Sequence, residues 1–166
     1  MKYGVIMIFH PIRPIYNNDS KILILGSFPS AKSREENFYY ANPYNRFWKL
    51  IAIMFNVEFS NSIEEKIDFL LRNKIALWDV ISSCDINGSS DSSIKNVRPN
   101  DIEMIINSSD IKLIVLNGRT SEKYFNMFFK NAFSIDTICL PSTSPANARE
   151  SIESLLPLWS IIKKYI

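Results

Sequence analysis

The stretch ILILGSFPS, residues 22 to 30, carries the clearest signal for the class of fold. An apolar run without polar alternation is typical of a strand buried on both faces of a parallel sheet. Gly26 and Pro29 then mark a sharp exit from the strand into a loop. Three later runs have the same form. The predicted strands are Lys21–Gly26, Lys74–Val80, Ile111–Asn117 and Ile135–Leu140.

Segments with apolar residues at helical spacing separate these strands. Asn45 is a suitable N-cap for the first of them, and Ser62 with Glu65 predicts a capping box at the second. Strands that alternate with helices predict an α/β fold with a parallel sheet and right-handed crossovers. The predicted helices are Arg46–Asn56, Ser62–Asn73, Asn100–Asn107, Ser121–Phe129 and Ser151–Tyr165.

Length and composition favour one domain over residues 1–166. The net charge of +2 neither requires nor excludes a nucleic-acid partner. Cys84 and Cys139 are too few for a four-cysteine cluster, so we expect free buried thiols in a reducing compartment. The apolar run Val5–Phe9 is too short to span a membrane. A cytoplasmic location is therefore expected.

The unusual sequence falls in the segments that follow the predicted strands. In open α/β sheets, ligands bind beyond the carboxyl ends of the strands. Aromatic and amide side chains crowd the first of these segments, and Pro, Ser and Asn the last, which predicts two walls of one site. Residues 88–93, GSSDSS, are expected to form a mobile loop. The predicted loops are Ser27–Asn45, Ile81–Arg98, Gly118–Ser121 and Pro141–Asn147.

Several kinds of catalytic site are excluded by the residues present. His10 is the single histidine and precedes Pro11, which favours a local structural role. No metal-ligand cluster, catalytic triad or phosphate-binding glycine loop is present. The remaining groups are amides, hydroxyls, backbone dipoles and aromatic rings. These groups suit binding of a base and cleavage of its bond to a sugar, which requires a positioned water and donors to the anionic base.

Three segments together resemble the uracil-DNA glycosylase superfamily, with the hypoxanthine DNA glycosylases as the closest branch: Gly26–Ser30, Tyr39–Trp48 and Leu140–Ala146. Asn45–Trp48 also resembles mismatch-specific uracil glycosylases. The resemblance implies a three-layer α/β/α sandwich around a four-stranded parallel sheet. It also implies monofunctional glycosylase chemistry, in which water attacks C1′ of a flipped-out nucleotide in DNA, with no metal or organic cofactor.

 The expected protein is thus a monofunctional glycosylase of base excision repair that acts on DNA as a monomer.

The resemblance also assigns roles to residues of the two loops. Tyr40 matches the aromatic residue that stacks on the extruded base, and Asn45 is favoured over Asn42 as the catalytic amide. Phe28 and Leu140 depart from the family pattern, which often has Asp or Asn at the first position and His at the second. The residues of the first motif, which contact the base, are Gly26, Ser27, Phe28 and Pro29. The residues of the second motif, which enter the duplex and grip phosphates, are Pro141, Ser142, Thr143, Ser144, Pro145 and Ala146.

Base selection follows from hydrogen-bonding patterns. Hypoxanthine presents a 6-oxo acceptor and an N1–H donor, whereas adenine reverses that pattern. Asn117, Ser82 and Asp79 at strand ends are candidate partners for the base, and hypoxanthine, uracil and xanthine all stay open as substrates. Two other functions also stay open: a non-catalytic module that binds damaged DNA or a nucleotide, and a protein-contact domain. The candidate phosphate contacts are Lys32, Arg34, Arg46, Arg98, Arg119 and Arg149.

Overall fold

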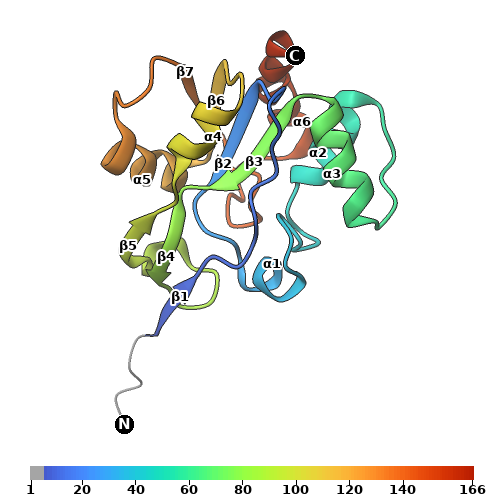
Figure 1. The fold of residues 1–166 in the computed structure, drawn as a ribbon. Coiled ribbons are helices and arrows are strands. Elements are labelled where there is room, and N and C mark those ends of the chain that lie inside the picture. Colours follow the sequence, from blue (N-terminus) through green and yellow to red (C-terminus); the bar gives the residue numbers. More distant parts are fainter. Residues whose placement is uncertain (1–5) are drawn as a thin grey trace.

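A computed structural model of the chain describes residues 6–166, so Val5 and the four residues before it lie outside the described part. Its centre is a four-stranded parallel sheet in the order β3-β2-β6-β7 (Figure 1). All four predicted strands are confirmed, each trimmed by one or two residues. They are β2 (Ile22–Gly26), β3 (Ile75–Asp79), β6 (Leu113–Asn117) and β7 (Asp136–Leu140).

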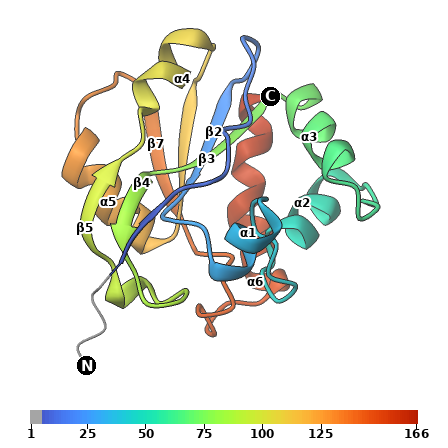
Figure 2. The same ribbon diagram turned by 60° about the horizontal axis from the view of Figure 1, so that its bottom comes forward.

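Helices cover both faces of this sheet, which confirms the three-layer α/β/α sandwich (Figure 2). On one face lie α2 (Phe47–Phe55), α3 (Ile63–Arg72) and α6 (Ile152–Trp159). On the other lie α4 (Ile102–Ser108) and α5 (Arg119–Phe129). After α6, the chain continues as a 3-10 helix over Ser160–Tyr165. No helix within residues 6–166 is both long and apolar enough to cross a membrane.

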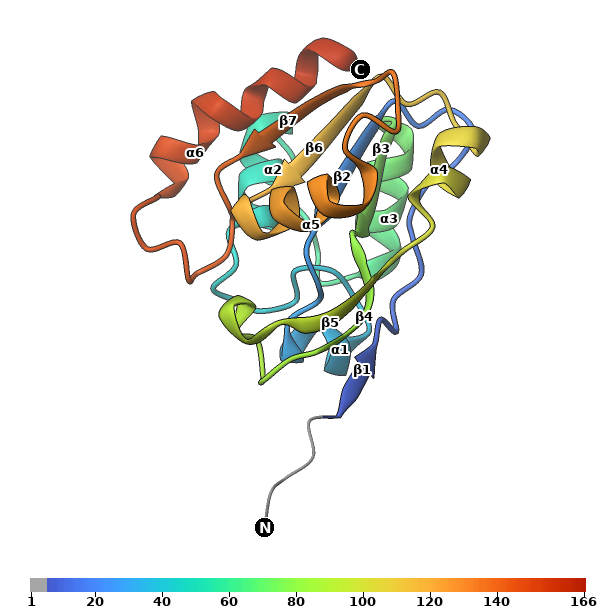
Figure 3. The ribbon, with the colours of Figure 1, turned by 90° about the vertical axis from the view of Figure 1, so that its left-hand side faces the viewer.

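A second sheet was not predicted, and the expectation of a loop over Ile81–Arg98 is wrong. Its antiparallel strands are β1 (Met7–Phe9), β4 (Ile81–Asp85) and β5 (Lys95–Pro99), in the order β1-β4-β5. The polar sequence of β4 and β5 lacks a strong strand pattern, and pairing with distant segments supplies their hydrogen bonds instead. Because β4 follows β3 almost directly, this sheet lies beside the carboxyl ends of the parallel strands (Figure 3).

Local signals at helix ends are only partly confirmed. The Ser62 hydroxyl accepts a hydrogen bond from the Glu65 N–H at 3.3 Å, but the Glu65 carboxylate binds Ser60 instead of closing the predicted capping box. A complete capping box occurs at α6, between Ser151 and Ser154. The predicted loop Ser27–Asn45 contains a further short helix, α1 (Ala31–Glu36).

Register places the polar strand ends at one edge of the sheet. Strands β2, β3 and β6 are buried along their whole length, as their unbroken apolar sequence predicts. Gly26 at the end of β2 lies opposite Asp79 at the end of β3, and Asn117 of β6 lies opposite Leu140 of β7. The segments that follow β2, β4 and β7 border a common cavity, whereas none of residues 118–121, which follow β6, lines it.

Candidate functional site

A cavity of about 190 Å³ opens at the carboxyl ends of the parallel strands. This volume is below the roughly 300–1,000 Å³ of pockets for drug-sized ligands, so the cavity suits a small, flat group. Pro141 lies outside, where its carbonyl accepts a hydrogen bond from Trp159 Nε1 at 3.0 Å. The predicted site residues that line the cavity are Gly26, Ser27, Phe28, Pro29, Tyr40, Asn42, Asn45, Asn117, Ser142, Thr143, Ser144, Pro145 and Ala146.

The floor of the cavity is formed where Gly26, Asp79 and Tyr40 converge. A Cβ atom at position 26 would overlap with Oδ1 of Asp79 and would lie 3.1 Å from Oη of Tyr40. Only glycine leaves room for both side chains. The glycine at the end of β2 is therefore required by side chains that come from β3 and from the loop after α1.

Asp79 is held by His10, a contact that the sequence did not predict. Nε2 of His10 lies 2.7 Å from Oδ2 of Asp79, although the two residues are 69 positions apart. Nδ1 of His10 accepts a hydrogen bond from the Ile12 N–H at 3.2 Å. The expected structural role of His10 is therefore not a local one, because pairing of β1 with β4 brings this residue to the end of β3.

Tyr40 has a backbone conformation that is rare for an aromatic residue. Its φ angle is +54°, in the left-handed region, which costs about 1–3 kcal/mol for a residue other than glycine. Its ring stacks on Phe47 of α2, with the centroids 4.2 Å apart. Burial raises the pKa of the Tyr40 hydroxyl, with a further contribution from the charge of Asp79, so this group stays a neutral phenol. The strained turn directs the ring into the cavity lining.

Asn117 lines the cavity, but its amide already has partners. Nδ2 donates to Oη of Tyr40 at 3.1 Å and to Oγ1 of Thr143 at 3.0 Å. Oδ1 accepts from the Thr143 N–H at 3.0 Å. Asn117 therefore joins the aromatic side of the cavity to the second motif, and its role in binding the base stays a prediction.

The two candidate catalytic amides lie in one turn at the mouth of the cavity. The Asn45 N–H donates to the Asn42 carbonyl at 2.9 Å. Oδ1 of Asn45 accepts from the Phe47 N–H at 2.9 Å, but the predicted N-cap is wrong by one residue, because Arg46 is the N-cap of α2 and makes no side-chain cap bond. Oδ1 of Asn42 similarly accepts from the Tyr44 N–H at 2.9 Å. In both side chains the Nδ2 group has no protein partner within residues 6–166.

The second motif is fixed to the sheet and to α2 through buried contacts. Thr143 is fully buried, and its carbonyl accepts from the Arg46 N–H at 3.0 Å. The Arg46 guanidinium donates to the carbonyls of Ser144 at 2.6 Å and Asn147 at 2.8 Å, and also to that of Glu150. Arg46, proposed from the sequence as a phosphate contact, is thus engaged by the protein's own backbone.

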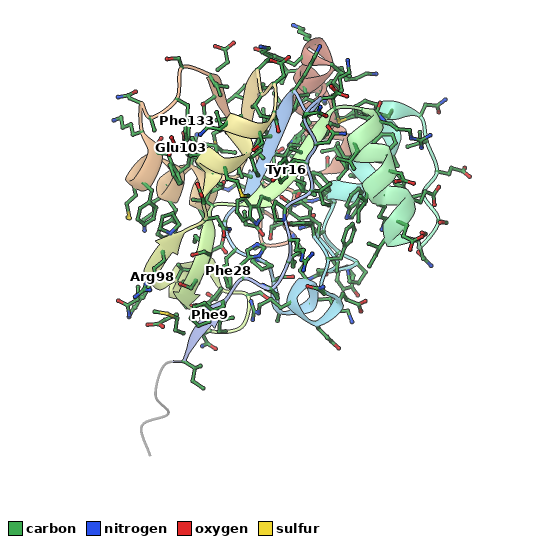
Figure 4. All side chains as sticks on the ribbon, in the orientation of Figure 1. Phe9, Tyr16, Phe28, Arg98, Glu103 and Phe133 are labelled. Carbon is green, nitrogen blue, oxygen red and sulfur yellow. The ribbon has the colours of Figure 1, made fainter. Side chains whose placement is uncertain are left out.

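The first motif is held in a similar way by Arg34. The Phe28 side chain, labelled in Figure 4, is only 8% exposed, and the Arg34 guanidinium lies over its ring at 5.6 Å from the centroid. Arg34 also donates to the Pro29 carbonyl at 2.7 Å and the Gly88 carbonyl at 3.2 Å. Phe28 supplies no polar side-chain group to the cavity, as its sequence predicts.

Residues of the connection between β4 and β5 complete the rim. Ser89 and Asp91 line the cavity, and Oγ of Ser89 accepts from the Ala31 N–H at 2.9 Å. Burial raises the pKa of the Asp91 carboxyl, and the charge of Asp79 adds to this effect. Residues 91–93 form a 3-10 turn within the segment expected to be a mobile loop. This segment belongs to one of the loops predicted to follow the strands, although neither Ser89 nor Asp91 was named as a site residue.

The described part of the chain was searched for side chains that could hold a metal ion and for reactive thiols. Within residues 6–166, no group of three His, Cys, Asp or Glu side chains is arranged to hold a metal ion. Both cysteines are free; Cys84 is buried and Cys139 is partly exposed. Burial raises the pKa of each thiol to about 11, so neither is an activated nucleophile near neutral pH.

Comparisons with known proteins agree with this arrangement. The model of the uracil DNA glycosylase superfamily matches residues 13–163. A hypoxanthine DNA glycosylase from Methanosarcina barkeri is 32% identical over 89% of this chain and 92% of its own length. One from Methanosarcina acetivorans is 37% identical over 82% of this chain and 87% of its own length.

A solved structure extends the likeness to three dimensions. It is the solution NMR structure of a proposed uracil DNA glycosylase from Methanosarcina acetivorans, with a TM-score of 0.81 and 30% sequence identity. The match covers 95% of this chain and 97% of the other. The family model, the two sequence relatives and the solved structure all indicate one family, and the cavity lies between the two motifs that first suggested it. This chain belongs to the uracil DNA glycosylase superfamily.

Proposed function

We propose that this protein is a monofunctional DNA glycosylase that removes deaminated bases, with hypoxanthine in deoxyinosine as the first substrate and uracil as the second. Two relatives named hypoxanthine DNA glycosylase, which align over most of the chain, support this assignment. We further propose that it acts as a monomer in the cytoplasm, in keeping with its two unpaired cysteines.

The reaction requires water to attack C1′ of the flipped-out nucleotide. The water oxygen bonds to C1′, the bond from C1′ to the base nitrogen breaks with its electron pair moving to the base, and a proton of the water is released. Asn45 or Asn42 orients the water, since both amides lie at the cavity mouth with Nδ2 unengaged by the described protein. Donors that face the departing base then stabilise its negative charge.

The observation that carries the proposal is the single cavity enclosed by both motifs. The first motif, Tyr40 and the second motif border the same space of about 190 Å³. An extruded base can enter such a space from the duplex, stacked against an aromatic ring. A site of this size, lined by hydroxyls and amides, meets the needs of a flat heterocycle.

Cleavage of defined duplexes tests the proposal. Oligonucleotides that carry one deoxyinosine, deoxyuridine or deoxyxanthosine are incubated with the protein and then treated with alkali. We expect alkali-labile sites at deoxyinosine, with equal yield in the presence of EDTA. Activity that EDTA removes and a divalent ion restores would contradict the metal-free mechanism.

A non-catalytic module that binds damaged DNA or a nucleotide is the second candidate. The apolar Phe28 favours it, because this position offers no side chain that could activate water. Such a module would bind the deoxyinosine duplex more tightly than its unmodified counterpart and leave no alkali-labile site. The cleavage experiment, repeated with a binding measurement, separates the two functions.

A further inference from the structure

We propose that Tyr44 inserts its ring into double-stranded DNA and occupies the space that the flipped-out nucleotide leaves in the base stack. The inference rests on the proposed function, since it concerns how the target base leaves the duplex. It places the inserted side chain on the turn that precedes α2, and not in the second motif.

The Tyr44 side chain lies at the mouth of the cavity and points away from it. It is the most exposed large apolar residue among residues 6–166, at 79%. Single exposed apolar residues are common on protein surfaces, so the position of this one is what gives it meaning. Asn42 and Asn45 on either side line the cavity, whereas Tyr44 does not. The ring is therefore on the side from which a nucleotide enters.

The turn that carries Tyr44 is held in place by its own hydrogen bonds. The Asn45 N–H donates to the Asn42 carbonyl at 2.9 Å, which closes a β-turn with Pro43 and Tyr44 at its centre. Asparagine and proline are favoured at the first two positions of such a turn. Oδ1 of Asn42 also accepts from the Tyr44 N–H at 2.9 Å. Because the backbone is already ordered, less entropy is lost when the ring inserts.

The second motif offers no side chain of similar size for this purpose. Its residues are proline, serine, threonine and alanine, and of these only Pro145 and Ala146 are exposed. Two larger rings lie nearby, but Phe28 is buried and Tyr40 is assigned to the extruded base itself. Tyr44 is therefore the aromatic ring at the mouth that is available to the duplex.

A side chain in this position has a clear task in a duplex. Extrusion of a nucleotide costs unpairing and unstacking energy, and the bases on either side lose a stacking partner. Apolar side chains that insert between base steps take over that contact. An aromatic ring suits any sequence, because every base has a π-face. In a single strand no base pair is broken, so insertion has far less to contribute.

The first test compares one deoxyinosine oligonucleotide in two forms, single-stranded and paired with its complement. Single-turnover cleavage is measured for the unaltered protein, Tyr44→Ala and Tyr44→Phe. We expect Tyr44→Ala to be slower by about 10- to 100-fold on the duplex, the range set by one base–aromatic stack, and unchanged on the single strand. Tyr44→Phe keeps the ring and should retain both rates.

Met127→Ala is the matched control, because Met127 is also an exposed apolar residue, at 58%, but lies on α5. Both of its rates should equal those of the unaltered protein. Equal losses of Tyr44→Ala on the duplex and on the single strand would overturn the inference, because they would indicate a role in the turn or in the chemical step. Unchanged cleavage of the duplex by Tyr44→Ala would overturn it as well.

A second duplex decides the matter if the unaltered protein cleaves only double-stranded DNA. It carries a pyrene nucleotide opposite deoxyinosine, and the large pyrene ring fills the stack in place of the target base. Pyrene thus supplies what the inserted side chain would supply. We expect the deficit of Tyr44→Ala to disappear on this duplex. A deficit as large as that with the ordinary complement would overturn the inference.

The proposed function can fail separately. If the unaltered protein cleaves neither form of the oligonucleotide, the glycosylase assignment fails, and the fluorescence of 2-aminopurine placed beside deoxyinosine in the duplex then decides the role of Tyr44. A rise in fluorescence on binding reports unstacking, and its loss in Tyr44→Ala would support insertion. An equal rise with both proteins, or no rise with either, would overturn it.

Discussion

At the scale of single residues, the two polar atoms of the Asn45 side chain have different roles, one in folding and one in the cavity. Oδ1 supports the first turn of α2 by accepting the Phe47 N–H at 2.9 Å, and Nδ2 is left for a water or a base. The same side chain therefore stabilises the helix start and offers a polar group at the cavity mouth. A substitution that keeps the oxygen and removes the amide nitrogen separates the two roles.

Asn45→Ser keeps an oxygen that can accept the Phe47 N–H but removes the amide nitrogen. We expect near-normal stability and a cleavage rate lower by about 10²–10³, the usual cost of losing one transition-state contact. Asn45→Ala should in addition lose the hydrogen bond from the Phe47 N–H and about 1 kcal/mol of stability. Thermal unfolding and single-turnover cleavage give the two readouts. If Asn45→Ser cleaves at the original rate, the catalytic role passes to Asn42, which is the next variant to measure.

Tyr40 lies between Phe47 and the cavity, and its ring and hydroxyl have separate contacts. Tyr40→Phe keeps the ring and loses the hydrogen bond from Asn117, so we expect a mild effect. Tyr40→Ala should weaken binding of the deoxyinosine duplex by about 1–3 kcal/mol, the usual contribution of one base–aromatic stack. Binding titrations measure this difference. Equal behaviour of Tyr40→Phe and Tyr40→Leu, with unfolding of Tyr40→Ala, would show a purely structural role.

At the scale of elements, the second motif depends on the start of α2. Arg46 connects this helix to backbone carbonyls about 100 positions later in the chain, through Nη2 to Ser144 and Asn147. The loop has no regular secondary structure of its own over these residues. Its shape is therefore set by a side chain from another element.

Arg46→Met should release this loop while keeping a side chain of similar length. Each hydrogen bond to a charged group contributes about 1.5–3 kcal/mol, so we expect lower stability and a marked loss of activity. Hydrogen exchange should show faster exchange at residues 142–150. Arg149→Met is the control, since Arg149 is an exposed arginine in the same region. Equal exchange in both variants would contradict the role assigned to Arg46.

At the scale of the whole molecule, binding of DNA must rely on a few local charges. The net charge is only +2. Lys32 pairs with Glu36 at 2.8 Å, and Arg119 pairs with Glu122 at 2.7 Å. Arg34 and Arg46 are engaged by backbone carbonyls. Arg149 lines a groove beside the second motif and is the best placed of the sequence-predicted basic residues to contact a phosphate.

Arg149→Gln should weaken DNA binding equally for different base sequences. Each lost phosphate contact lowers the magnitude of the slope of log K against log salt concentration by about 1. Arg72→Gln is the matched control, because Arg72 ends α3 and precedes the amino end of β3, at the opposite edge of the sheet. Titrations at several salt concentrations measure the slopes. Equal slopes for the two variants would remove Arg149 from the interface.

The central sheet and most of the cavity lining can be predicted from local features of the sequence. Apolar runs such as residues 22–25 are local signals, because a strand buried on both faces needs apolar residues at every position. The loops after parallel strands meet at one edge of the sheet, so the sequence alone predicts that their unusual residues lie together. Of the residues predicted to form the two motifs, to orient water or to contact the base, all except Pro141 and Ser82 line the cavity.

Which polar groups in that cavity lack a protein partner depends on contacts between segments far apart in the sequence. The contact of His10 with Asp79 spans 69 positions, and that of Arg46 with Ser144 spans 98. The antiparallel sheet that carries His10 has weak strand signals and forms by pairing between distant segments. Hydrogen bonds between distant residues leave no periodic pattern in a sequence, because the partner of each group is set by how the layers pack.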